Sequence, residues 1–162
     1  MSGMAKTYIS ILIDTLKKKE DVLLKLKEET AGQSLLLDAE EVDREAFNAS
    51  LETKDKLLEK LAELDEGFMD LYKRVGEEMK NNTPEYATQV SKAQELIRRQ
   101  TDITTELTAM EERNKNKLAL YLTQGKQKIK DFKVSSSAAA AYYKNMSGKH
   151  QEGESYFFNR KK

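Results

Sequence analysis

The longest unbroken pattern of apolar and polar residues runs from Pro84 to about Lys133. Its apolar residues recur at intervals of three and four, which places them on one face of a helix. A helix of about fifty residues would be roughly 75 Å long. Thr83 can act as its N-cap, and Pro84 suits the first helical position, where no N–H is needed. This apolar face, which other helices must cover, comprises Tyr86, Val90, Ala93, Leu96, Ile97, Ile103, Leu107, Met110, Leu118, Tyr121, Leu122, Ile129 and Phe132.

Two further helical patterns precede this segment. The first predicts a helix over residues 5–30, with Gly32 as its C-cap. Lys19 falls on the apolar line of this helix. Either the helix is exposed there, or the lysine stem lies along apolar surface and keeps its charge in water. The linker over residues 33–37 contains three leucines, so we expect it to pack over one end of a bundle.

The second pattern predicts a helix that runs to about residue 80, before a break at residues 81–84. Asp38 and Glu41 have the spacing of a capping box, which would start this helix at residue 39. Asp43 is an equally good cap for a start at residue 44. The apolar stripe is wide enough to contact two partners, so we expect this helix in the middle of the bundle.

Together the patterns predict an all-α protein, an elongated antiparallel three-helix bundle or coiled coil over residues 1–133. Short connections make neighbouring helices antiparallel. Folding the chain at Asn82 sets residue n opposite roughly residue 164 − n. An acidic pair at residues 65–66 then faces an arginine pair at residues 98–99. Exposed ion pairs of this kind set register more than stability.

In this arrangement the first helix lies beside residues 96–120 of the third, and residues 121–133 overhang the core. The leucines of the 33–37 linker can cover part of the overhang. The remaining apolar residues lack a partner in the chain, so we expect another protein to bind them. The candidate partner-binding residues on this helix are Leu118, Tyr121, Leu122, Gly125, Ile129 and Phe132.

Two polar residues, Gln100 and Asn114, also fall on the apolar face of the third helix. Polar residues at such positions set the register inside a coiled-coil seam. The alternative is that they line a groove open to a partner, and the sequence leaves both interpretations open.

Residues 134–162 differ in composition from the helices. A serine and alanine run leads into Tyr142 and Tyr143 and predicts a short helix, and residues 148–155 are typical of disorder. Five of the twelve aromatic residues lie in the last 28 positions, although flexible tails are ordinarily poor in aromatics. We therefore expect two short binding motifs in an otherwise flexible tail, or aromatics that fold back onto the protein's own helices. The candidate residues are Tyr142, Tyr143, Phe157 and Phe158.

Composition fits long helices, with 38% hydrophobic residues, 35% charged residues, one proline and no tryptophan. The formal net charge is zero, so no global field attracts nucleic acid or an anionic membrane. No signal peptide is visible, and no apolar run approaches the ~18–20 residues that a membrane span needs. Residues 38–80 are mainly acidic and residues 113–133 mainly basic. This asymmetry indicates complementary helix faces or, alternatively, a basic docking end.

The residues that enzymes use are largely missing. The single histidine, His150, lies in the tail, and the chain has no cysteine. This composition excludes Ser-His-Asp and Cys-His arrangements in the helices, and neither a Glu-x-x-His pair nor a Gly-rich phosphate loop occurs. The lysines that follow Gly125 belong to no recognised nucleic-acid module. The sequence therefore predicts a non-enzymatic protein without cofactor, metal or nucleic acid, which binds other proteins through apolar helix faces.

A family resemblance narrows this prediction. The stretch LETKDKLLEKLAELDEGF at residues 51–68, followed by a long third helix with Asn114 and Tyr121, resembles the FlgN family. The ending is also similar, with its serine and alanine run, a tyrosine pair at 142–143 and a terminal Tyr-Phe-Phe before basic residues. The resemblance implies a cytoplasmic chaperone of flagellar type III export. Its expected partners are the terminal helical segments of hook–filament junction proteins, whose premature assembly it would prevent, and the export gate component that receives them.

Two alternatives stay open. The FliT family, which serves the filament cap protein, is similar in size and helix content. A self-associating structural coiled coil would instead form a homodimer through the same apolar stripe. In the chaperone interpretation, an open helix face accepts an amphipathic helix of the client, and a stable interface would bury about 1,200–2,000 Å² in total.

Overall fold

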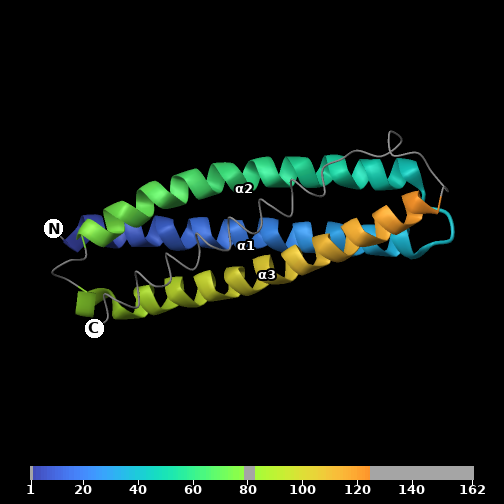
Figure 1. The fold of residues 1–162 in the computed structure, drawn as a ribbon. Helices are drawn as coiled ribbons and strands as arrows, with labels where there is room; N and C mark the ends of the chain where they lie inside the picture. Colours follow the sequence, from blue (N-terminus) through green and yellow to red (C-terminus); the bar gives the residue numbers. More distant parts are fainter. Residues whose placement is uncertain (1, 79–82, 125–162) are drawn as a thin grey trace.

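The computed structural model describes residues 2–78 and 83–124, and every regular element in these ranges is a helix (Figure 1). Helix α1 spans Ser2–Asp38, α2 spans Arg44–Glu78 and α3 spans Ala87–Thr123. A short 3₁₀ helix, η1, covers Thr83–Tyr86 and leads into α3. The predicted all-α helical bundle is therefore confirmed.

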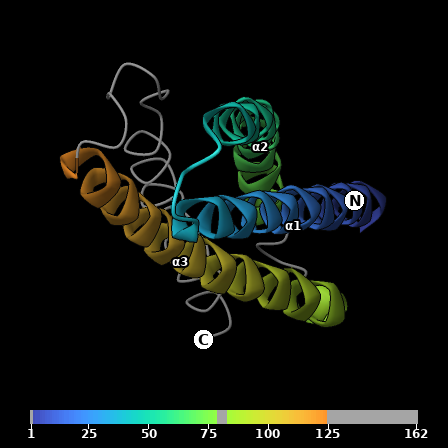
Figure 2. The same ribbon diagram turned by 90° about the vertical axis from the view of Figure 1, so that its right-hand side faces the viewer.

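The central helix of the bundle is α1. It packs against both α2 and α3, and α2 runs antiparallel to the other two (Figures 1 and 2). Lys19 and Gln33 on one edge of α1 reach α2, whereas Thr30 on the neighbouring edge reaches α3. The prediction that α2 lies in the middle is wrong, because the face of α1 is wide and long enough to contact both neighbours.

The first helix continues well past its predicted end at residue 30. Residues 33–37 are its last turns rather than a linker, and Gly32 lies on its exposed side. The spacing of core residues continues without a break, since Gln33 and Leu37 are buried in step with Leu26 and Thr30. A glycine inside a helix costs about 1 kcal/mol relative to alanine, and the burial of Leu37 offsets that cost.

Helix α2 begins at the later of its two predicted starts. Asp43 Oδ1 accepts a hydrogen bond from the backbone N–H of Ala46 at 3.1 Å, which is the contact of an N-cap. The backbone N–H of Phe47 donates to the carbonyl oxygen of Asp43 at 2.9 Å and closes the first turn. The start at residue 39 is wrong because residues 39–43 form the connection between α1 and α2.

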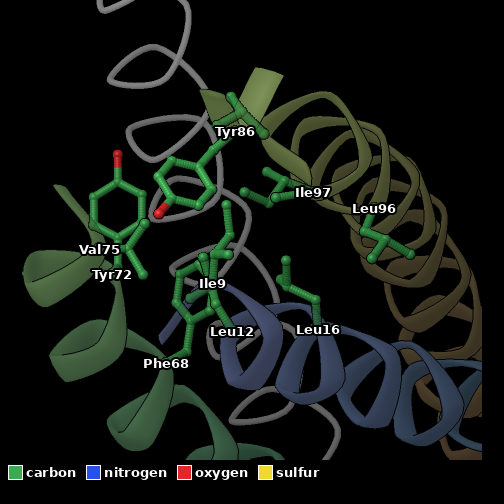
Figure 3. Close-up of a cluster of buried hydrophobic side chains, with 11 residues drawn as sticks. Ile9, Leu12, Leu16, Phe68, Tyr72, Val75, Tyr86, Leu96 and Ile97 are labelled. Carbon is green, nitrogen blue, oxygen red and sulfur yellow. The ribbon is translucent and has the colours of Figure 1, made fainter. Parts of the chain in front are cut away.

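A first apolar cluster fills the end of the bundle that holds the N-terminus of α1 (Figure 3). The rings of Phe68 and Tyr72 lie 5.7 Å apart, and Tyr86 of η1 is buried in the same cluster. Because Tyr86 belongs to η1, the predicted third helix begins as a 3₁₀ turn at Thr83, and its α-helical part starts at Ala87. The cluster comprises Ile9, Leu12, Leu16, Phe68, Tyr72, Val75, Tyr86, Val90, Ala93, Leu96 and Ile97.

Two smaller apolar clusters follow along the bundle. Full burial of a leucine side chain contributes about 1.5–3 kcal/mol, so these clusters supply much of the stability of the remaining length. The second cluster comprises Val22, Leu23, Leu26, Leu61 and Leu107. The third cluster comprises Leu37, Val42, Phe47, Leu51 and Tyr121.

Polar layers separate the three clusters. The first polar layer contains Lys19, Asp65 and Gln100, and Lys19 is 1% exposed rather than open to water as predicted. The second polar layer lies between the second and third clusters. It comprises Thr30, Gln33, Lys54, Glu111 and Asn114.

Ion pairs also join α1 to α3 at the surface. Arg99 pairs with Glu20 of α1, and Lys27 Nζ lies 2.9 Å from Glu106 Oε2. The prediction that Arg99 faces the acidic residues 65–66 of α2 is therefore wrong, because Arg99 turns toward the central helix instead.

Candidate functional site

The predicted partner-binding residues of α3 that the structure describes lie in or against the third cluster. Tyr121 is 8% exposed, and Leu118 and Leu122 are half-buried. They pack against the C-terminal end of α1, the 39–43 connection and the start of α2. As far as Gln124, the predicted overhang is wrong, because the extra turns of α1 cover this part of α3. The side chains packed against them are Leu36, Leu37, Val42, Phe47 and Leu51.

The 39–43 connection is attached to α3 through Tyr121. The backbone N–H of Val42 donates a hydrogen bond to the Tyr121 hydroxyl at 3.4 Å, near the long limit for such a bond. Tyr121 thus buries its ring and still satisfies its polar end. Between α1 and α2, only the five residues 39–43 lack helical structure at this end of the bundle.

The rim of the third cluster combines polar ties with exposed leucines. Lys117 Nζ lies 2.8 Å from Asp38 Oδ1 and donates to Ser34 Oγ at 2.9 Å. Leu35 and Leu120 are 74% and 60% exposed. In sequence, Leu35 precedes Leu36 and Leu120 precedes Tyr121, and both of these neighbours belong to or pack against the third cluster. We define the candidate site as this end of the bundle, namely residues 35–51 and 117–122.

The other candidate residues, Gly125, Ile129, Phe132, Tyr142, Tyr143, Phe157 and Phe158, lie outside the described residues. The predicted helical segment 125–133 and the predicted tail, including its short helix, lie outside them as well.

Comparisons with known proteins yield no relative. No family model matches the chain, and the searches of curated proteins and of solved structures give no match. The site therefore has to be interpreted from its own chemistry.

That chemistry is apolar packing beside a buried ion pair. Lys54 of α2 donates from Nζ to Glu111 of α3 and to Gln33 Oε1 of α1 at 2.9 Å. Both charged side chains are almost completely buried, at 2% and 0% exposure. Burial lowers the pKa of Lys54 below its ordinary value of 10.5, and attraction to Glu111 opposes that shift.

Lys54 and Glu111 were not identified as core residues from the sequence, because charged side chains are almost never fully buried unless they are paired. The signal was their spacing. Lys54 lies at seven-residue intervals in the row Phe47, Lys54, Leu61, Phe68 and Val75, and Glu111 continues the row Val90, Ile97 and Thr104.

Gln100 and Asn114 belong to the seam of the bundle. Gln100 Nε2 donates to the Leu16 carbonyl oxygen at 2.5 Å, and Asn114 Nδ2 donates to that of Thr30 at 3.1 Å. Both side chains are buried, so the prediction that they lie inside the seam is confirmed and the open-groove alternative is wrong. Their role in setting the register stays a prediction.

Within residues 2–78 and 83–124, no group of three or more His, Cys, Asp or Glu side chains is arranged to hold a metal ion. In the same ranges, none of the helices has the length and apolar character that crossing a bilayer would take.

Proposed function

We propose that this protein is a cytoplasmic chaperone of flagellar type III export. It binds terminal helical segments of hook–filament junction proteins, prevents their premature assembly and delivers them to the export gate. The observation that supports this proposal best is the candidate site. It gathers apolar side chains of α1, α2 and α3 at one end of an elongated bundle. Two exposed leucines, Leu35 and Leu120, lie next in sequence to Leu36 and Tyr121 of this group.

The proposed binding mode follows from this arrangement. An amphipathic client helix lays its apolar face over Leu35 and Leu120 and displaces the 39–43 connection. Leu118, Tyr121 and Leu122 then exchange contacts with the connection for contacts with the client. This exchange leaves the buried apolar area of these three residues nearly unchanged. The net gain on binding therefore comes from Leu35 and Leu120, which the client helix removes from water.

Capture experiments test the proposal. The full chain should retain a hook–filament junction protein and lose it when the client lacks its terminal helices. Equal capture of both clients would contradict the proposed recognition. Capture of a filament cap protein instead would favour the FliT-like alternative.

A pair of variants tests the site itself. Leu35→Asp/Leu120→Asp should weaken client capture at least tenfold, which corresponds to about 1.4 kcal/mol, with helicity unchanged. Leu24→Asp is the matched control, because Leu24 is an exposed leucine of α1 at 45% and lies outside the site. Equal loss in both variants would show that the client does not bind at this end.

Self-association remains the second candidate function. Leu24 and Leu35 lie eleven residues apart on α1, close to three full turns, and so share one exposed side of the helix. Light scattering separates the two functions. A tight dimer that Leu24→Asp dissolves would favour the structural coiled coil.

A further inference from the structure

The two halves of α3 are held in the bundle by different kinds of side chain. Up to Ile97 the buried residues are mostly apolar and belong to the first cluster. From residue 104 onward, three of the five buried residues are polar, and the apolar Leu107 and Tyr121 lie far apart. The buried positions of the second half of α3 are therefore more polar than those of the first half, although Leu118 and Leu122 also pack against the third cluster.

Two of the buried polar contacts meet at Glu111. Its carboxylate accepts a hydrogen bond from Lys54 Nζ of α2. The Thr30 hydroxyl of α1 lies 3.2 Å from Glu111 Oε1 and shares its one proton between that oxygen and the Leu26 backbone oxygen, which is 2.7 Å away. One turn further on, Asn114 donates to the Thr30 backbone oxygen. Glu111 thus links the second half of α3 to both other helices at one level of the bundle.

This layer is incompletely satisfied. Among the described residues, Glu111 Oε2 and Gln33 Nε2 are buried without a hydrogen-bond partner. A buried network with unpaired atoms stabilises a fold less than a fully paired one. The loss of one charge from a buried pair is far more harmful than the replacement of both by apolar groups, because the remaining charge stays buried and uncompensated.

We propose that the Lys54–Glu111 pair is a conformational latch for the second half of α3. While the pair is intact, residues 104–123 stay docked on α1 and α2. When it breaks, this segment detaches as one unit and uncovers Leu107 and Tyr121, while residues 87–100 stay in the first cluster. The test below contains no partner protein, so this inference is decided independently of the proposed function.

Amide hydrogen exchange on the full-length chain, followed by mass spectrometry, tests the latch. Glu111→Gln keeps the shape of the side chain but leaves the Lys54 ammonium without its counterion. It should speed exchange in residues 104–121 about 100-fold, with residues 88–100 unchanged. Glu106→Gln is the control, because Glu106 pairs with Lys27 at the surface of the same stretch of α3. This variant should exchange like the wild type, since an exposed ion pair contributes little stability.

A second variant removes both charges. Lys54→Met/Glu111→Leu should return exchange in residues 104–121 to within about fivefold of the wild type, because no uncompensated charge remains. The proposal is overturned if Glu111→Gln speeds exchange equally along all of α3 or unfolds the whole chain. It is also overturned if the double variant exchanges as fast as the single one.

Discussion

Lys19 of α1 places its ammonium 2.6 Å from Oδ1 of Asp65 and 4.4 Å from the centre of the Phe68 ring, both in α2. The lysine is almost fully buried, so its charge is compensated inside the bundle and not by water. A carboxylate and an aromatic face both attract a cation, and each attraction strengthens when water is excluded. The contact fixes α1 against α2 at the boundary between the first and second clusters.

Substitutions in this pair should have unequal effects. Asp65→Ala leaves a buried ammonium without its carboxylate and should lower the free energy of unfolding by about 3 kcal/mol. Lys19→Met removes the charge and keeps an unbranched apolar chain over Phe68, so it should cost no more than about 1.5 kcal/mol. Urea denaturation followed by circular dichroism measures both, with the exposed Asp70→Ala as control. A loss in Lys19→Met as large as that in Asp65→Ala would contradict the assigned role of the pair.

Gly32 gives a second prediction, since its position decides whether α1 continues. A Cβ built on Gly32 has no heavy atom within 4 Å, and the residue is helical. Gly32→Ala should therefore raise the free energy of unfolding by about 0.5–1 kcal/mol. Gly67→Ala in α2 is a matched comparison, because its Cβ also meets open space and should stabilise by a similar amount. If Gly32 instead ended the helix in a left-handed conformation, the alanine variant would be destabilised.

The start of α2 gives a third prediction. Asp43→Ala removes the side chain that accepts the Ala46 N–H and should cost about 1 kcal/mol. Glu41→Ala should be nearly neutral, because Glu41 is exposed and precedes the helix. Thermal denaturation of the two variants separates the two starts that the sequence offered. The opposite order of stability would place the helix start at residue 39.

Helix faces could be predicted from the sequence, whereas the way in which the faces meet could not. Periodicity identified three helices, and the predicted register placed residue 54 opposite residue 110, next to Glu111. It did not reveal that α1 is central, because the apolar face of α2 is just as wide. The capping signals at Gly32 and Asp38 were equally misleading, since tertiary burial of Leu37 outweighs a local preference to end the helix.

The candidate site was predicted in part. Leu118, Tyr121 and Leu122 fall on the apolar face as expected, but their covering by α1 and the 39–43 connection follows from eight further helical residues beyond the predicted end at 30. This difference also shifts the pairing of α1 with α3, so that Thr30 lies beside Asn114 and not near residue 120. The buried charges at Lys54 and Glu111 were invisible because residue type alone assigns charged side chains to water.

The titration of Lys54 provides the last prediction. Burial lowers the pKa of Lys54 in the folded protein below the ordinary value of 10.5, which the unfolded chain retains. At alkaline pH below 10.5, the unfolded state therefore binds more protons at this site than the folded state. The free energy of unfolding that Lys54 contributes must then rise with pH as the pH approaches 10.5. The measurement compares the wild type with Lys54→Met/Glu111→Leu, which retains every other side chain and lacks the buried pair. The difference in free energy of unfolding between the two proteins, from urea denaturation at a series of alkaline pH values, should grow in favour of the wild type. A constant or falling difference would mean that the buried ammonium keeps its proton as firmly as one in water.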